Sequence, residues 1–409
     1  MASLKYWLWL TQLHSMTPAQ ILAVLRHFGT PEGVYFADPG EYQLVEGLTG
    51  RARKALGDKR LAGAELILEE CEKLGLSLLT IQDAQYPDCL KNIPDPPALL
   101  YYKGKLPPFD EVPTIGVVGT RSCTPYGEKV AAKLGLDLAR AGAVLVSGIA
   151  EGIDGQAVRG ALAGGGTVVS VLGGGIDVKY PACNRYLYDD VAAAGALISE
   201  YPPGTRPLGT NFPVRNRIIS GLSDGVVAVE SGERGGTLIT MNQALEQSRD
   251  TFAVPGPVDA PESAGTNRLI RDGCAKLITC ADDVLVEYAD RYPVLRRARP
   301  SLTPQAQAQR LESVMDPGVR EQPAEKKEVD KRPQPAYIDW KSARELFSDD
   351  ERDMILALEG TQLTADELVE RTQIPAKRVL SALTILQVRG YAQETPGHKF
   401  AATVQIRPD

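Results

Sequence analysis

TIGVVGTRS at residues 114–122 and VLVSGIAEGID at residues 144–154 form the stretch that decides the fold. Each part is a short β-branched run that leads into a glycine-containing turn. The Ala-rich segment 129–141 between them has the length of a helix. Short strands that alternate with helical segments predict a parallel sheet with helices on both of its faces.

The alternation continues to about residue 290, with a second Ala-rich helical segment at 156–163. The expected strands are Ile115–Val118, Val144–Val146, Val168–Leu172, Leu197–Ile198, Val226–Val229 and Phe252–Val254. This pattern predicts an α/β fold for residues 111–290, with an extended Rossmann-like and mostly parallel sheet.

Residues 1–75 are expected to form a separate helical domain. Apolar residues recur at helical spacing in Ile21, Leu22, Leu25 and Phe28. The stretch 44–56 resembles the hairpin of a helix–hairpin–helix or SAM-like domain, in which hairpin glycines present backbone N–H groups to a phosphate. A helical bundle that serves packing alone is the alternative.

Two further segments connect the domains. Residues 76–110 are rich in proline and are expected to be a connector. Residues 291–345 carry many Pro, Gln and charged residues with few apolar ones, which is typical of a flexible linker.

The last segment, 346–409, regains helical periodicity. Thr364 and Glu367 form a capping box, a second helix starts near Pro375, and a short polar hairpin occupies 394–399. Helices followed by such a hairpin are typical of a winged helix, a module that binds DNA or other proteins. Lys377 and Arg378 are the basic residues that begin its expected recognition helix.

Composition narrows the function classes. Hydrophobic content of 43% and charged content of 24% are those of a globular protein, and no apolar run approaches the ~20 residues of a membrane span. Six cysteines without a CxxC pair and three histidines favour reduced thiols in the cytoplasm and no metal site. The net charge of -7 counts against a nucleic-acid ligand, although a local basic track is sufficient to bind phosphate.

Four polar or glycine-rich turns directly follow expected strands. They occupy residues 119–122, 147–154, 173–175 and 232–237. In an open α/β sheet such loops gather at the carboxyl edge of the strands, where glycine lets the backbone approach an anion and a helix N-terminus adds partial positive charge. Together they favour a phosphate-bearing ligand over a packing role alone.

Side chains near these turns suit a nucleic acid. Arg121 follows the first strand and can grip a phosphate with both arms of its guanidinium, although an ion pair with Asp154 is the alternative. Phe212, with Arg215 and Arg217 close behind, suits base stacking beside neutralisation of the backbone, although Phe212 can also be an anchor in the core. Asp154 repels phosphate, so we expect it to cap its helix and orient its neighbours.

No catalytic motif accompanies these loops. The chain lacks GxxxxGK[ST], GxSxG and an acidic cluster spaced for a metal pair. We therefore expect a binding protein that is not an enzyme and uses no cofactor.

The blocks VVGTRS, SGIAEGID, GGGIDVKYP, SEYPPG, NFPVRNRIISGLSDGVVAVE, GGTLIT, FAVPG and GTNRLIRDG follow one another through the central domain. On these blocks the chain resembles the DprA/Smf family (DNA-processing protein A). The resemblance implies a homodimer that binds and protects incoming single-stranded DNA and loads RecA onto it during natural transformation, in competent cells. It also implies contact with single-strand-binding protein.

The loops and the resemblance together give the expected single-stranded DNA contacts. These are Gly119, Thr120, Arg121, Ser122, Ser147, Gly148, Ala150, Gly152, Ile153, Gly173, Gly175, Asn211, Phe212, Arg215, Asn216, Arg217, Gly235, Gly236 and Thr237. Thr120 and Thr237 stand where serine is usual in the family and keep a hydroxyl. Ala182 and Gly209 stand where some relatives place a lysine, so part of the backbone track lacks its cation.

Two other functions remain as alternatives. A phosphoribohydrolase of the same architecture would carry glutamates after the GGT turn, where this chain has Ile239 and Thr240. A scaffold that binds RecA and touches DNA incidentally is the second alternative.

Overall fold

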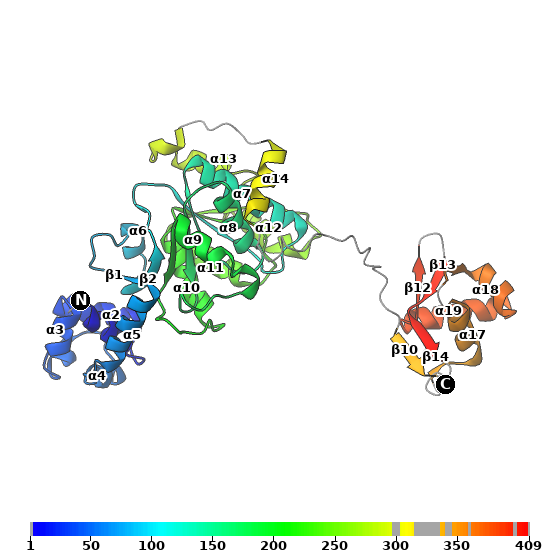
Figure 1. Ribbon diagram of the computed structural model, residues 1–409, viewed down its shortest axis with the longest axis horizontal. Coiled ribbons are helices and arrows are strands. Elements are labelled where there is room, and N and C mark those ends of the chain that lie inside the picture. Colours follow the sequence, from blue (N-terminus) through cyan, green and yellow to red (C-terminus); the bar gives the residue numbers. More distant parts are fainter. Residues whose placement is uncertain are drawn as a thin grey trace. The chain divides into compact units, whose positions relative to one another are not determined.

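The computed structural model describes residues 3–296, 303–314, 336–339, 346–358, 361–395 and 399–407. The chain divides into two compact units, Met1–Glu321 and Gln322–Asp409 (Figure 1). No helix in these described ranges has the length and apolar character that crossing a bilayer requires.

A nine-stranded sheet organises the first unit, with strand order β1-β2-β6-β5-β4-β3-β7-β8-β9. Its strands are β1 (Ser77–Thr80), β2 (Leu99–Gly104), β3 (Thr114–Val118), β4 (Val144–Ser147), β5 (Val168–Leu172), β6 (Ala196–Ser199), β7 (Gly225–Ala228), β8 (Asp250–Ala253) and β9 (Lys276–Leu277). From β6 to β9 every neighbouring pair is parallel, whereas β2 runs antiparallel to both β1 and β6. The predicted extended Rossmann-like, mostly parallel sheet is confirmed.

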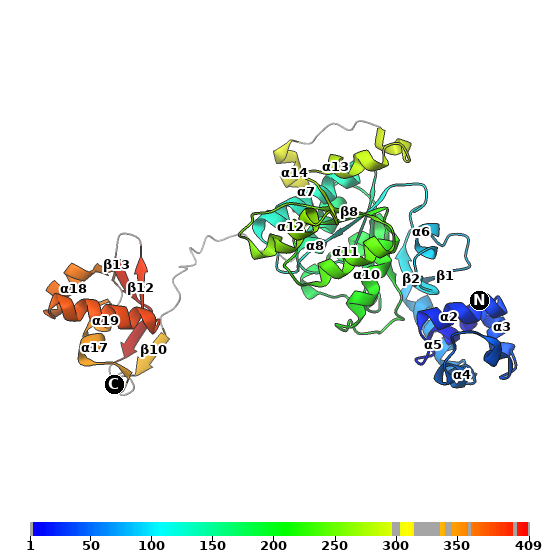
Figure 2. The same ribbon diagram turned by 180° about the vertical axis from the view of Figure 1, so that it is seen from behind.

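Helices cover both faces of the sheet (Figures 1 and 2). One hydrophobic cluster joins the sheet to α7 (Pro125–Ala141), α8 (Ile153–Ala163), α9 (Leu187–Ala194) and α13 (Asp282–Leu285). A second cluster joins the other face to α6 (Asp88–Lys91), α10 (Asn211–Gly221), α11 (Gly236–Glu246) and α12 (Ala264–Arg271). Short 3-10 turns lie at η2 (Ala182–Asn184), η3 (Pro261–Ser263), η4 (Val286–Tyr288) and η5 (Pro293–Arg296).

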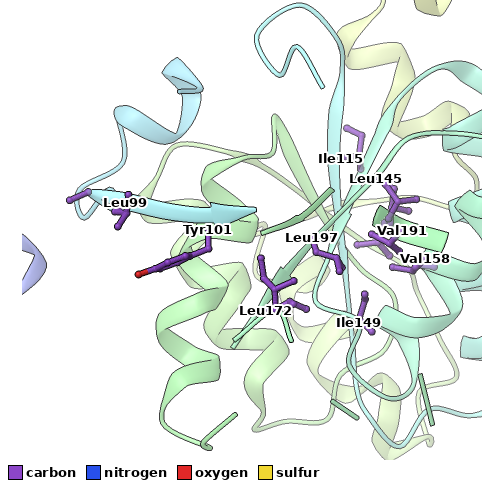
Figure 3. Packing of buried hydrophobic residues seen from close by; sticks show 14 of the residues in the cluster. Leu99, Tyr101, Ile115, Leu145, Ile149, Val158, Leu172, Val191 and Leu197 are labelled. Carbon is purple, nitrogen blue, oxygen red and sulfur yellow. The ribbon is translucent and has the colours of Figure 1, made fainter. Parts of the chain in front are cut away.

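The strands alternate their side chains between these two clusters. Ile115, Leu145 and Leu197 enter the first cluster, where Figure 3 shows them with Val158 of α8 and Val191 of α9. Their strand neighbours, such as Val144, Val146, Val169 and Ile198, enter the second cluster. Since both faces are buried, the strands are continuous apolar runs, as is typical of parallel sheets.

The prediction that residues 76–110 form a connector between domains is wrong. β1 and β2 lie within it and extend the sheet, with Tyr101 of β2 paired to Ser199 of β6. The prolines before and after β2, at 96–97 and 107–108, concealed this strand in the sequence.

The N-terminal region is helical as expected. It contains α1 (Leu4–Thr11), α2 (Pro18–Phe28), α3 (Pro31–Phe36), η1 (Glu41–Leu44), α4 (Gly50–Leu56) and α5 (Ala62–Leu74). The hairpin predicted at 44–56 joins η1 to α4 and buries Val45 and Leu48. Gly47 there has φ +81°, which a residue with a Cβ rarely adopts.

Part of the predicted linker 291–345 is ordered. The helix α14 (Pro304–Ser313) packs on α8, where the Arg159 guanidinium donates to the Leu311 carbonyl at 2.9 and 3.1 Å. The strand β10 (Ala336–Asp339) also falls within the predicted linker and pairs in parallel with β14 (Val404–Arg407). The remainder of the predicted linker, apart from η5 and its neighbours, lies outside the described residues.

The second unit has the predicted winged-helix architecture. Its further elements are α17 (Asp349–Leu358), β11 (Leu363–Thr364), α18 (Ala365–Thr372), α19 (Ala376–Val388), β12 (Ala392–Thr395) and β13 (Lys399–Ala402). The capping box of Thr364 and Glu367 is formed, and β12 pairs antiparallel with β13 as the wing. The tip of the predicted hairpin, 396–398, lies outside the described residues. Arg378 is held by Asp350 at 2.5 Å, which leaves Lys377 as the unpaired cation at the start of α19 among the described contacts.

Glycines allow α7 and α8 to pack closely. A Cβ on Gly135 would lie 2.1 Å from the Ala157 carbonyl oxygen, and a Cβ on Gly160 would lie 2.0 Å from the Ala132 carbonyl oxygen. The two helix backbones therefore touch at both positions, and this contact fixes the start of α8 beside the first loop.

We expect Gly160→Ala to lower the free energy of unfolding by about 1–3 kcal/mol, because the new methyl group has no space. Urea unfolding followed by circular dichroism measures this change. The matched control is Gly63→Ala in α5, where nothing lies within 4 Å and alanine should stabilise the helix by about 0.5–1 kcal/mol. Equal stability of the two variants would contradict the close contact of α7 and α8.

Candidate nucleic-acid interface

The strand order reverses beside β3. The chain passes from β3 through β4 and β5 to β6 on one side, and then returns to β7 on the other side of β3. In open α/β sheets, ligands bind in the crevice outside the carboxyl ends of the strands at such a reversal. The loops after β3 and β7 border this crevice.

A pocket of about 460 Å³ occupies the crevice. It is lined by Val118, Gly119, Thr120, Arg121, Ala150, Asp154, Gly209, Phe212, Pro213, Arg215, Asn216, Ile219, Ser231, Gly232, Arg234, Gly235, Gly236, Thr237 and Thr240. These residues come from the first, second and fourth predicted loops and from the start of α10. The pocket is within the size range of small-ligand clefts.

Backbone hydrogen bonds fix the first loop. The Thr120 N–H donates to the Glu230 carbonyl at 2.9 Å, and the Ile153 N–H donates to the Thr120 carbonyl at 3.2 Å. The buried Glu230 carboxylate accepts from both the N–H and the hydroxyl of Thr124, the residue that caps α7. This arrangement holds Arg121 at the mouth of the pocket.

Arg121 and Phe212 lie against each other. The guanidinium carbon of Arg121 is 4.8 Å from the centre of the Phe212 ring, within the range of a cation–π contact. Arg121 is exposed, and within the described residues its guanidinium makes no ion pair or hydrogen bond. The positive charge of Arg121 is therefore available to an anion, and binding would disrupt only the weak contact with the Phe212 ring.

A buried pair of opposite charges forms the floor of the pocket. Arg215 is 4% exposed and Asp154 is 6% exposed. Burial raises the pKa of the Asp154 carboxyl, an effect opposed by Arg215 and by backbone N–H groups, among them that of Gly148 at 3.2 Å. Burial lowers the pKa of the Arg215 guanidinium, and Asp154 opposes this. The pair orients the second loop, because Arg215 also donates to the Val171 carbonyl and occupies the space beside Gly148.

The helix α11 begins at the opposite wall. Gly235 and Gly236 border open space, so their backbone is accessible to a ligand. The first N–H groups of a helix lack partners within it and carry partial positive charge. Arg234, which is exposed beside them, adds a full charge.

The third loop lies behind Phe212. A Cβ on Gly173 would be 2.9 Å from Cδ1 of Phe212, and the Asn211 side-chain amide donates to the Gly173 carbonyl at 3.0 Å. Gly175 is packed against Pro202 and Gly204. This loop therefore supports the aromatic ring from below.

The structure brings ten of the predicted contact residues to the pocket wall. They are Gly119, Thr120, Arg121, Ala150, Phe212, Arg215, Asn216, Gly235, Gly236 and Thr237. Ser122 is exposed just beyond the first loop, and Gly152, with φ +80°, packs against the carbonyls of Thr120 and Arg121.

Several other predicted contacts need correction. Ser147 is fully buried and donates to the Val117 carbonyl at 2.7 Å, and Ile153 is fully buried beneath Gly119. Arg217 is 7% exposed and forms an ion pair with Glu200 at 2.8 Å. Arg215 reaches the pocket only from its floor. Burial of both side chains does not fit the expected role of these arginines in neutralising a DNA backbone: Arg217 is paired with Glu200, and Arg215 lies in the interior beside Asp154.

The contacts also bear on two expectations about Asp154, its ion pair with Arg121 and its role as a helix cap. The described contacts contain no ion pair between Arg121 and Asp154, so this alternative is not the arrangement present; Asp154 instead accepts from the Gly148 N–H. Asp154 orients its neighbours as expected, but Gly152 occupies the N-cap position of α8 and no side chain caps it.

Arg234, Ser231 and Thr240 are not among the contacts expected from the sequence. All three line the pocket. Arg234 lies in the fourth loop between Glu233 and Gly235, and an arginine in a turn after a strand is the signal that also marked Arg121. Within the described residues no group of His, Cys, Asp and Glu side chains is placed to hold a metal ion.

The first unit is therefore a doubly wound α/β protein with a pocket at its strand reversal that carries exposed arginines, and the second is a winged helix. The family model described as "DNA recombination-mediator protein A" matches residues 77–289, and that of the DprA winged helix domain matches residues 333–398. The chain belongs to the DprA/Smf family of DNA-processing proteins.

Individual relatives support this membership. "DNA processing protein DprA" of Bacillus subtilis is 43% identical over 225 residues, which are 55% of this chain and 75% of the relative. "Protein Smf" of Synechocystis is 37% identical over 278 residues, 67% of this chain and 70% of the relative. The X-ray structure of DprA from Streptococcus pneumoniae superposes with a TM-score of 0.62 at 36% identity and covers 69% of this chain and 97% of that one.

Proposed function

We propose that this protein binds single-stranded DNA in the pocket at the strand reversal, protects the incoming strand and loads RecA recombinase onto it during natural transformation. The pocket carries the proposal. Two cations, Arg121 and Arg234, the start of α11 and an aromatic ring at Phe212 converge on one cavity. A phosphate and its attached base require these groups together.

The acidic net charge does not oppose an anion at this place. Asp154 is the carboxylate among the described lining residues, and Arg215 offsets it within the interior. Glu230 is buried and its oxygens are engaged by Thr124. The exposed lining therefore presents glycine amides, hydroxyls and two unpaired arginines to the ligand.

The site favours an unpaired strand over duplex DNA. An aromatic ring at a pocket wall binds the face of a base, and the faces of bases in a duplex are covered by their neighbours. We expect oligo-dT to bind the full chain more tightly than a duplex of equal length or free mononucleotides, with an affinity that falls steeply as salt is added. Fluorescence anisotropy over a salt series tests this, and an affinity independent of salt would contradict it.

We propose binding without catalysis. The wall offers the hydroxyls of Ser231, Thr237 and Thr240, but Thr240 donates to the Gly236 carbonyl at 3.2 Å and no histidine of the described lining stands beside any of them. Ile239 and Thr240 occupy the positions where a phosphoribohydrolase would carry glutamates. Release of free base from a nucleoside monophosphate by the full chain would favour the hydrolase instead.

Three partners complete the proposal. Family resemblance supports RecA, single-strand-binding protein and a second copy of the chain as partners in the cytoplasm. The last strand of the sheet, β9, is paired on one side only within the described residues, and Leu277 and Val286 near it are exposed, which suits a dimer. Growth of RecA filaments on DNA coated with single-strand-binding protein tests the loading step, and sedimentation equilibrium tests the dimer.

We expect removal of the winged helix to leave single-stranded DNA binding within about threefold of the full chain. Residues 1–321 form a compact unit that contains the whole pocket, whereas α19 offers one unpaired cation, Lys377. Anisotropy with oligo-dT on the fragment 1–321 measures this, with the full chain as control. A loss greater than tenfold would place the main contacts in the second unit.

A further inference from the structure

Tyr180 places a second aromatic ring beside the pocket. Its ring centre lies 5.9 Å from that of Phe212, with 32° between the ring planes, and the residue is 42% exposed. Tyr180 follows the third loop and precedes Pro181, and Phe212 precedes Pro213 in the same way. An aromatic residue directly before a proline thus occurs in two segments that the fold brings together, the loop before η2 and the first turn of α10.

The backbone of Tyr180 is held rigidly. The buried hydroxyl of Tyr188 donates to the Tyr180 carbonyl at 2.8 Å and accepts from the Tyr180 N–H at 3.1 Å. Nearby, the Asn184 side-chain amide donates to the carbonyls of Ile149 and Ala150 at 3.1 and 2.9 Å, which ties this segment to the second loop. A ring on a fixed backbone loses little conformational entropy when a ligand stacks on it.

Nothing in the described fold uses the end of this side chain. The Tyr180 hydroxyl makes no hydrogen bond among the described residues. Burial of a tyrosine in the core or a bond to its hydroxyl would account for the residue without a ligand, and here neither is present.

Phe212 is less accessible than Tyr180. The Arg121 guanidinium lies 4.8 Å from the Phe212 ring centre, the Gly173 backbone closes against the ring, and the residue is half-buried. A base can stack on Phe212 only after Arg121 moves, whereas the exposed part of the Tyr180 ring is accessible to a base without such a movement.

We propose that Tyr180 is a second base-stacking residue of the single-stranded DNA site. The two rings then contact neighbouring bases of one strand. Arg121 leaves the Phe212 ring and binds the phosphate that joins these two nucleotides. The site therefore takes a ligand of at least two linked nucleotides. This inference rests on the proposed function.

The test compares two ligands of equal charge, a dT 15-mer and an abasic 15-mer that retains the sugar-phosphate backbone. We expect Tyr180→Ala to weaken binding of the dT 15-mer about 5- to 10-fold, near the lower end of the range for one stacked base. Binding of the abasic 15-mer should change less than twofold, because no phosphate contact is lost. Tyr180→Phe keeps the ring and should bind both ligands within twofold of the unaltered protein.

Leu66→Ala provides the matched control, since Leu66 is an exposed apolar side chain of α5 outside the pocket and its removal should affect neither ligand. A second readout is Tyr180→Trp, whose added fluorescence relative to the unaltered chain should be quenched by the dT 15-mer and not by the abasic one. Equal weakening of both ligands by Tyr180→Ala, or none, would overturn the role of Tyr180 while DNA binding stands. Failure of the unaltered protein to bind the dT 15-mer would overturn the proposed function itself.

Discussion

Arg121→Ala is expected to weaken binding of single-stranded DNA about 10- to 100-fold at moderate salt. A hydrogen bond to a charged group contributes about 1.5–3 kcal/mol, and a guanidinium can bind phosphate with two such bonds. Arg121 has no competing ion pair in the described structure, so its contribution to the ligand is lost in full when the side chain is removed.

The slope of affinity against salt separates this effect from an indirect one. Loss of one phosphate contact on a single strand should reduce the slope of log affinity against log salt by about 0.7. Arg121→Lys keeps the charge and therefore the slope, but it loses the two-armed geometry and should bind with intermediate affinity.

Arg60→Ala is the matched control, because Arg60 is an exposed arginine of the N-terminal region whose partner, Asp58, lies two residues away. It should leave both affinity and slope unchanged. Unaltered affinity of Arg121→Ala for oligo-dT would remove the first loop from the site.

Arg215→Ala is expected to lower the free energy of unfolding of the first unit by about 1–3 kcal/mol. The substitution leaves the buried Asp154 carboxylate without the nearby charge of Arg215, although the two side chains make no direct ion pair in the described structure. A buried polar group that loses its compensation costs about this amount. The Val171 carbonyl also loses its donor.

Hydrogen exchange of peptides from α8 and α10 measures this change within the first unit. The pair Asp154→Asn and Arg215→Met removes both charges together, and it should recover at least half of the lost stability because no buried charge remains. Arg60→Ala again serves as the control for loss of an exposed arginine. Protection of α8 in Arg215→Ala equal to that of the unaltered protein would contradict the interior role of the pair.

The central fold was predictable because its strands are buried on both faces. Each of the six expected strands coincides with an observed one to within two residues at either end, since a continuous apolar run between turns has few other solutions. β1, β2 and β9 were missed for a physical reason. They are edge or near-edge strands of two to six residues, and their pairing depends on partners distant in the sequence.

The site was predictable in its loops and less so in its side chains. Glycine after a strand marks where backbone can approach a ligand, and the first and fourth loops do line the pocket. The exposure of an arginine depends on partners from other elements. Arg215 and Arg217 lie in one helix and are both buried, because Arg215 donates to the Val171 carbonyl and Arg217 pairs with Glu200, and their own segment carries no sign of either partner.

The two antiparallel strands at the start of the sheet limit how the pocket can be isolated. A fragment that begins at residue 111 would lack β2. The backbone N–H and C=O groups of β6 around Ser199 that pair with β2 would then be unpaired. An exposed strand edge of this kind can pair with other chains, so we expect the fragment to aggregate before its ligand affinity can be measured. The shortest usable form of the binding unit therefore begins ahead of Ser77, well upstream of its first phosphate loop.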